Sequence, residues 1–191
     1  MGSANVLVIV NSPDSRAAGA GSFPGARVRF DSAGSHPELG GMIDDLYSAK
    51  LLKLAANLPR AGRLSAPDAT SEKVSKLCGS RVTVDVKVEG RQVADFAQDV
   101  KACALGQAAA GVLGQHVIGA SAQEITEARD AMSAMLKAGG EGPSGRFEDL
   151  RVLKQVADYP ARHASTLVAV EATLEAVNAA LAARTRLAGA A

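Results

Sequence analysis

The sequence predicts an α+β fold, in which a small antiparallel sheet of about three strands is packed by helices. Between residues 82 and 88 four valines alternate with polar residues, the pattern of a strand with one apolar and one solvated face. Glu89-Gly90 then makes a turn, and residues 91–100 return as the second strand of a hairpin. Most segments with helical periodicity follow this hairpin instead of alternating with strands, which favours an antiparallel sheet over a parallel one.

The composition is that of one ordinary globular domain. Of the 191 residues 47% are apolar and 21% are charged, and the net charge is +1. Such a balance gives no electrostatic reason to bind nucleic acid or an anionic membrane. The apolar run at residues 6–10 is too short to span a membrane, and no basic segment precedes it. We therefore expect a cytoplasmic protein that has no membrane partner.

The chain divides at about Met42. Residues 1–41 are rich in Gly, Ala, Ser and Pro, and we predict a poorly ordered N-terminal extension there. Residues 42–184 carry the regular periodicities and form the predicted domain, and residues 185–191 are a C-terminal tail.

Local sequence signals mark where several predicted elements of the domain begin or end. Pro59 ends the first helix, and Ser121 followed by Glu124 is a capping box that opens a later one. We expect a connector, rather than a helix, at residues 160–164. Besides the hairpin, the expected elements are a helix at 44–57, a strand at 69–75, a helix from Cys103 to about Val117, a helix from Ser121 that Gly139-Gly140 closes, a short helix at 147–156 and a last helix at 165–184.

Two cysteines are the main candidates for chemistry. Cys78 lies in a Cys-Gly-Ser turn just before a strand, where Gly79 lets the backbone bend and leaves the sulfur free to point outward. Cys103 stands at the N-terminus of a helix, where unpaired amides and the helix dipole favour the thiolate. A single cysteine is more often a small buried hydrophobe. Two cysteines at element ends make metal or thiol chemistry an equal alternative.

The three histidines differ in their surroundings. His36 falls in the extension, and His116 near the end of its helix fits a C-terminal cap. His163 lies in the expected connector, where its side chain could face a site or could be solvated.

Taken in order, these pieces resemble the NifU/IscU-like iron–sulfur cluster scaffold family, and especially its SufU branch. Residues 58–62 (LPRAG) are similar to the family's NPRNxG segment, and residues 78–80 (CGS) to its Cys-Gly-Asp. Residues 103–110 (CALGQAAA) resemble its C-[AS]-I-S-x-A-S-A helix, and residues 147–150 match the stretch that leads to the third ligand. The long insert that holds the Ser121 helix is typical of the SufU branch.

The resemblance implies a function and a site. We expect an iron–sulfur cluster assembly scaffold or carrier, not an enzyme, that binds iron, zinc or a [2Fe–2S] cluster through Cys78 and Cys103. A cysteine desulfurase and cluster-acceptor proteins are the implied partners. The chain departs from the family at two positions, because Ala164 replaces the third cysteine and Ser80 replaces the Asp. We therefore predict His163 as the third metal ligand, with water, Ser80 or an unidentified carboxylate in the fourth position. If His163 instead points to solvent, Asp99, Asp158 or water completes the shell.

Two alternatives remain at this point. The first is a thiol-dependent redox enzyme in which Cys103 is the nucleophile and Cys78 is the resolving residue. The second is a degenerate family member that has lost the metal and serves only as an interaction domain.

Overall fold

The computed structural model describes residues 48–188. The predicted extension at 1–41, with His36, lies outside the described residues. The elements are α2 (Ala49–Ala56), β1 (Ala69–Val74), β2 (Arg81–Glu89), β3 (Gln92–Lys101), α3 (Ala104–His116), α4 (Ala122–Ala138), the 3₁₀ segment η1 (Gly145–Asp158) and α5 (Pro160–Ala188).

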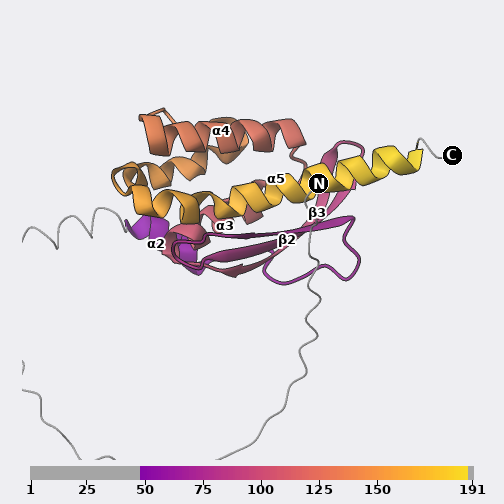
Figure 1. The fold of residues 1–191 in the computed structure, drawn as a ribbon, viewed down its shortest axis with the longest axis horizontal. Helices are drawn as coiled ribbons and strands as arrows, with labels where there is room; N and C mark the ends of the chain where they lie inside the picture. Colours follow the sequence, from indigo (N-terminus) through magenta and orange to yellow (C-terminus); the bar gives the residue numbers. More distant parts are fainter. Residues whose placement is uncertain (1–47, 189–191) are drawn as a thin grey trace, which may run out of the picture. The chain divides into compact units, whose positions relative to one another are not determined.

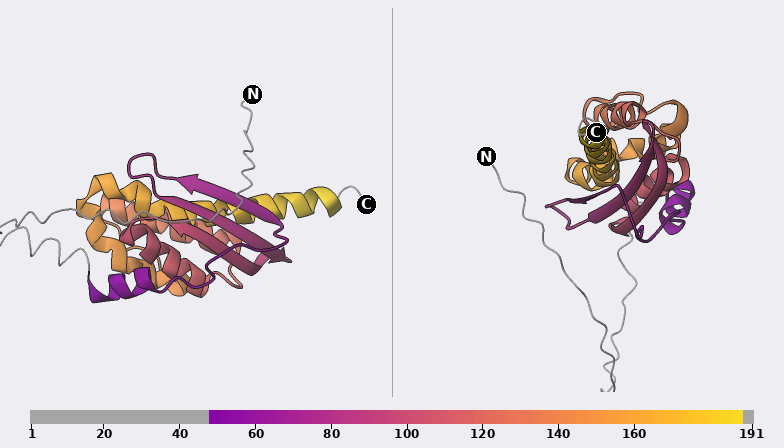
Figure 2. Two further views of the ribbon diagram at one scale, coloured as in Figure 1. Left: turned by 90° about the horizontal axis from the view of Figure 1, so that it is seen from below. Right: turned by 90° about the vertical axis from the view of Figure 1, so that its right-hand side faces the viewer.

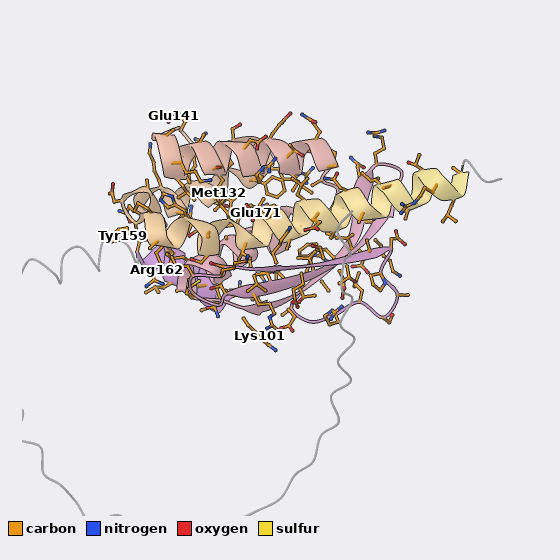
Figure 3. The ribbon with its side chains drawn as sticks, viewed as in Figure 1. Lys101, Met132, Glu141, Tyr159, Arg162 and Glu171 are labelled. Atoms are coloured by element: carbon orange, nitrogen blue, oxygen red, sulfur yellow. The ribbon has the colours of Figure 1, made fainter. Side chains whose placement is uncertain are left out.

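The three strands form one antiparallel sheet in the order β1-β2-β3, which confirms the predicted fold class. Figures 1 and 2 show the sheet as one layer, with α5 lying along one face and α4 beyond α5. The helix α3 lies beside α5, and α2 packs on α3. The four valines of β2 are buried under these helices, and the buried side chain of Met132 fills the space between α4 and α5 (Figure 3). The apolar face of β2 therefore forms the floor of the core.

The second face of β2 differs from the prediction of a solvated surface. Thr83 is 8% exposed and Asp85 is fully buried. The Asp85 carboxylate accepts two hydrogen bonds from Arg63, at 2.6 and 2.9 Å, one from the Leu64 backbone at 3.0 Å and one from the Thr70 hydroxyl at 2.6 Å. The segment before β1 therefore crosses this face and covers it. A buried charge is tolerated because four donors replace its hydration.

The LPRAG segment at residues 58–62 follows the free edge of β3. Gln98 exchanges backbone hydrogen bonds of 2.9 Å with Arg60 and Gly62, and its buried side-chain amide donates to the carbonyls of Pro59 and Ala110. These contacts fix the segment against both the sheet and α3. A strand edge that would otherwise expose unpaired backbone groups is covered in this way.

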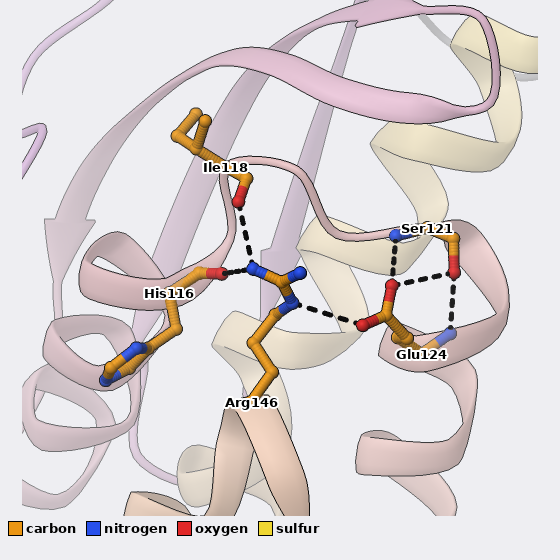
Figure 4. Close-up of polar contacts among 5 residues, drawn as sticks. All are labelled: His116, Ile118, Ser121, Glu124 and Arg146. Carbon is orange, nitrogen blue, oxygen red and sulfur yellow. Dashed lines mark hydrogen bonds and ion pairs between the residues drawn. The ribbon is translucent and has the colours of Figure 1, made fainter.

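The capping signals at α4 are confirmed. The Glu124 carboxylate accepts from the Ser121 backbone at 2.8 Å, and the Ser121 hydroxyl accepts from the Glu124 backbone at 3.2 Å. Gly139 closes the helix in the left-handed conformation. Arg146 joins this end to α3, because its guanidinium pairs with Glu124 at 3.1 Å and donates to the carbonyls of His116 and Ile118 (Figure 4). Arg146 therefore anchors the start of η1 to two helices.

Three predicted boundaries near the C-terminus are wrong. Pro160 is the first residue of α5, so the segment expected to be a connector at 160–164 is helical. Proline suits this position because its fixed φ matches the helix and its missing N–H would be unpaired there anyway. The helix also continues past its predicted end at residue 184 to Ala188, since Ala, Arg and Leu all favour helix. The helix predicted at 147–156 is a 3₁₀ segment that is longer at both ends.

One helix among residues 48–188, α5, is long and apolar enough to cross a membrane by those two criteria alone. More than half of its most apolar stretch is buried inside the protein, against α4 and the sheet. Its apolar character is therefore explained by its central place in the core.

Candidate functional site

Three segments meet at the end of the sheet that carries Cys78. The turn at residues 75–80 joins β1 to β2, and it is closed by a hydrogen bond of 2.8 Å from the Ser75 backbone N–H to the Ser80 carbonyl. Cys103 occupies the N-cap position of α3, just after β3 ends at Lys101. The first turns of α3 and α5 complete the site. Their close approach depends on Gly106, because a Cβ atom there would lie 2.9 Å from the Ser165 carbonyl oxygen.

The structure brings the two cysteines to one shared contact, the hydroxyl of Ser80. Cys78 Sγ lies 3.1 Å from Ser80 Oγ, which also accepts a hydrogen bond of 3.4 Å from the backbone N–H of Cys103. Both cysteines are free thiols; Cys78 is exposed and Cys103 is half-buried against the core. The β2–β3 hairpin explains why these residues are close. Arg81 directly follows Ser80, and Lys101 lies two residues before Cys103. Arg81 and Lys101 are paired across the hairpin.

Buried hydroxyl groups surround the Cys78 sulfur. Ser75 Oγ lies 3.4 Å from Sγ, and the hydroxyls of Ser80 and Ser165 also bond to it. All three serines are at most 5% exposed. Partial desolvation raises the pKa of Cys78, but hydrogen bonds from the hydroxyls of Ser75 and Ser80, the Ser80 backbone and Ser165 outweigh it. The net effect lowers the pKa of the Cys78 thiol to about 7.

This arrangement differs from the sequence-based expectation, which placed the favoured thiolate at Cys103. The N-terminus of a helix was a recognisable signal, whereas the serines belong to separate segments that only the fold assembles. Ser80 was visible as a neighbour of Cys78, but nothing in the local pattern pointed to Ser75 or Ser165. The contacts that stabilise a thiolate converge on Cys78.

The lowered pKa of Cys78 has a measurable consequence. In the Cys103→Ala variant with chelator present, alkylation of Cys78 should rise with pH to a half-maximum at about pH 7, because the thiolate is the reacting form. Ser80→Ala removes one donor to the thiolate and should move this midpoint to higher pH. The rate of iodoacetamide labelling, followed by mass spectrometry from pH 5 to 9, measures both. A midpoint near the ordinary cysteine value of ~8.5 in the Cys103→Ala variant would contradict the hydroxyl contacts.

His163 lies apart from this cluster of contacts. Its Nε2 is 3.2 Å from each of the carbonyl oxygens of Val156 and Ala157, at the end of η1. On α5 it lies about 200° around the helix axis from Ser165, which faces Cys78. Within residues 48–188 no group of three or more His, Cys, Asp or Glu is placed to hold a metal ion. The assignment of His163 as third ligand stays a prediction.

The other candidate ligands, His116 and Asp99, contact charged side chains of the fold. His116 is the last residue of α3, as expected of a C-terminal histidine, and its Nε2 lies 3.6 Å from Asp149. Asp149 also pairs with Lys50 at 2.8 Å, which ties α2 to η1. Asp99 lies 4.0 Å from Lys101 on β3.

Comparison with known proteins settles the family. A sequence model described as the NifU-like N terminal domain matches residues 46–166, which include both cysteines and most of the described domain. The chain belongs to this family. The match confirms the resemblance that the order of motifs indicated, and it ends at Thr166, just after the position of Ala164.

Individual relatives agree with this assignment. The crystal structure of a nitrogen-fixing NifU-like protein (N-terminal) from Brucella abortus is 49% identical, with a TM-score of 0.72 over 73% of this chain and 97% of that one. The iron–sulfur cluster assembly scaffold protein IscU of Thermotoga maritima is 25% identical over 69% of this chain and 92% of its own length. A putative SUF-system scaffold protein from Fervidobacterium islandicum, 22% identical with a TM-score of 0.64, shares the fold over 70% of this chain and 98% of its own.

Proposed function

We propose that this NifU-like domain is an iron–sulfur cluster assembly scaffold or carrier that binds iron, zinc or a [2Fe–2S] cluster through Cys78 and Cys103. The observation that carries the proposal is the position of the Ser80 hydroxyl, which lies 3.1 Å from the Cys78 sulfur and accepts a hydrogen bond from the backbone N–H of Cys103. Two thiols at one exposed end of a sheet are suited to take up and release a soft metal or a cluster. The Thermotoga relative, which bears the name of a scaffold protein, supports the same function.

The set of ligands indicates a labile site. Zinc takes four ligands and a [2Fe–2S] cluster usually takes four cysteines, so two thiolates supply half of either set. We expect the zinc ion to complete its shell with water or a nearby side chain, and a cluster to be shared with a second chain. An open site of this kind is consistent with a protein that passes its cargo on and does not act as an enzyme.

The partners follow from the same proposal. A cysteine desulfurase would supply sulfur, and cluster-acceptor proteins would receive the product. The charges favour neither nucleic acid nor an anionic membrane surface, since the net charge of the chain is +1. We propose that this assembly takes place in the cytoplasm.

The hydrogen bonds around the Cys78 sulfur favour a second candidate function, a thiol-dependent activity. The hydroxyls around Cys78 make this cysteine, and not Cys103, the better candidate for the attacking thiol. Thiol titration with and without chelator separates the two functions. Protection of both thiols by bound metal supports the scaffold, whereas one fast thiol that metal does not protect supports the thiol activity.

The direct test of the scaffold proposal is purification under anaerobic, reducing conditions. Elemental analysis beside an absorption spectrum should find iron, zinc or the charge-transfer bands of a cluster, in proportion to the protein. Protein that contains none of them, and that takes up neither Zn²⁺ nor Fe²⁺ when these are added, would exclude the proposal.

The prediction that His163 is the third ligand has its own test. His163→Ala should weaken Zn²⁺ binding on the order of tenfold, because the ion loses one ligand. His116→Ala, on the opposite end of α3 from Cys103, is the matched control and should bind as wild type does. Ala164→Cys, next to Ser165, should tighten binding by adding a thiolate. Unchanged affinity in His163→Ala would reduce the site to two cysteines.

A further inference from the structure

The two edges of the sheet differ in how they are covered. The edge of β3 is closed by residues 58–62, which exchange backbone hydrogen bonds with Gln98. Among residues 48–188 no segment pairs with the outer side of β1, the first strand in the order β1-β2-β3 (Figure 2). Such an edge presents free N–H and C=O groups to any extended segment that approaches it.

The register of β1 against β2 identifies these free groups. The Ser75 N–H donates to the Ser80 carbonyl at 2.8 Å, which makes this a bonded pair in register with the two strands. Bonded pairs of an antiparallel ladder recur at every second residue, so the odd-numbered residues of β1 bond to β2. The N–H and C=O groups that point outward therefore belong to the even-numbered residues Thr70, Glu72 and Val74.

A groove of about 460 Å³ lies between β1, α4 and α5. It is lined by Lys73 of β1, Arg129 of α4 and four residues of α5, Glu171, Leu174, Glu175 and Asn178. The strand is fixed to α5 on this side, because Ser71 donates to Glu175 at 3.1 Å and Lys73 pairs with the same carboxylate. A fourth strand added to β1 would direct every second side chain toward this side of the sheet.

One carboxylate of the groove has no cation. The two cations that line the groove each pair with a carboxylate. Glu171, half-buried on α5 (Figure 3), forms no ion pair within the described part of the chain. Leu174, which is 9% exposed, lies three residues further along the same helix and therefore on the same side. A lysine or arginine side chain suits this groove, because its apolar stem can cover the leucine while its charged end reaches the carboxylate.

A second copy of this chain is a poor occupant of the free edge. In two antiparallel copies of β1, the register that pairs all three outward residues places Glu72 directly opposite its own counterpart. Like charges at directly opposite positions destabilise a pair of strands. The edge therefore suits a strand from a different protein.

We propose that the free edge of β1 docks an extended segment of another protein, which adds a fourth strand to the sheet and places a lysine or arginine against Glu171. Main-chain hydrogen bonds to the three outward residues supply the affinity, and the groove supplies the specificity. No cysteine takes part, so this inference goes beyond the scaffold function and does not depend on it. The turn that carries Cys78 follows β1 directly, and a docked segment therefore holds its protein beside the candidate site.

Hydrogen exchange of the free, full chain tests whether the edge is open. The amide protons of Thr70, Glu72 and Val74 should exchange at least about tenfold faster than those of Ser71 and Lys73, as measured by NMR. Equal protection of the two sets at every chain concentration would mean that another part of the same chain covers the edge. Protection that grows with chain concentration would mean that a second copy covers it. Either result overturns the proposal.

The docking itself is tested with the synthetic peptide Thr-Val-Thr-Lys-Thr-Val-Thr, blocked at both ends, in which the lysine and the two valines share one face. At millimolar concentration it should slow the exchange of the three outward amides and shift their resonances. The same peptide with Glu in place of Lys should bind on the order of tenfold more weakly. Glu171→Gln should remove this preference. Glu148→Gln, the matched control, neutralises a carboxylate on η1 that also forms no ion pair among the described residues, and it should keep the preference.

Three further results would overturn the docking proposal. They are unchanged outward amides at millimolar peptide, equal binding of the Lys and Glu peptides, and a preference for Lys that survives in Glu171→Gln. Zn²⁺ binding by Glu171→Gln should equal that of wild type, so the failure of this proposal and the failure of the scaffold function are observed separately.

Discussion

Cys78→Ala and Cys103→Ala should each abolish most of the metal binding, on the order of a hundredfold or more in affinity for Zn²⁺ or Fe²⁺. The two residues are the only cysteines in the chain, so each variant leaves one thiol. A single thiolate holds a metal ion far less firmly than two, because the second ligand binds an ion that is already held in place. Competition with a chromophoric chelator under anaerobic conditions measures the affinities.

The double variant gives the sharper result. If both cysteines ligate one ion, Cys78→Ala/Cys103→Ala should bind scarcely less than either single variant, since residues in direct contact with one ligand are not additive. Losses of free energy that add would mean two separate sites and would contradict the scaffold proposal. Cys78→Ser and Cys103→Ser, which keep the size of the side chain, control for packing. All variants should keep the circular-dichroism spectrum of wild type.

The second large effect should arise from Asp85, far from the cysteine chemistry. Asp85→Ala should lower the free energy of unfolding by about 3 kcal/mol, because it leaves a buried backbone N–H and a hydroxyl without their charged acceptor. Arg63→Ala should cost less, since that side chain is 54% exposed and water replaces part of the contact. Urea denaturation measures both. Asp95→Ala, which removes a carboxylate whose backbone contact is only with the next residue, is the matched control and should change little.

The pH dependence of unfolding provides a second measure of Asp85. Burial raises the pKa of this carboxyl, but the bonds from Arg63, Thr70 and Leu64 outweigh it and lower the pKa below its ordinary value. A carboxyl with a lowered folded pKa stabilises the protein above the unfolded pKa of ~3.9, and this stability is lost as pH falls through the folded value. Asp85→Asn should therefore flatten the loss of stability below about pH 4. An equally steep loss in Asp85→Asn would assign the acid sensitivity to other groups, such as Glu124 or Glu175, whose pKa values are also lowered.

The sequence by itself determined the elements whose signals are local. The alternation of valines fixed β2, and Glu89-Gly90 fixed the hairpin, because a strand with one buried face has a period of two and a tight turn needs glycine. The capping box of Ser121 and Glu124 located the start of α4 to the residue, since both hydrogen bonds are made within one turn. The order of these motifs was also enough to indicate the family.

Only the tertiary structure decided what depends on segments far apart in the chain. Asp85 reads as a solvated residue of an alternating strand, and it is buried because Arg63 and Leu64 cross that face. Pro160 reads as a helix breaker, yet α5 begins there, so His163 turns toward η1 and away from Ser165. The cysteine site shows the same limit of prediction from local sequence. Local pattern located Cys78 and Cys103, but the hydroxyls that tune Cys78 come from both sides of its turn and from α5, and only packing brings them together.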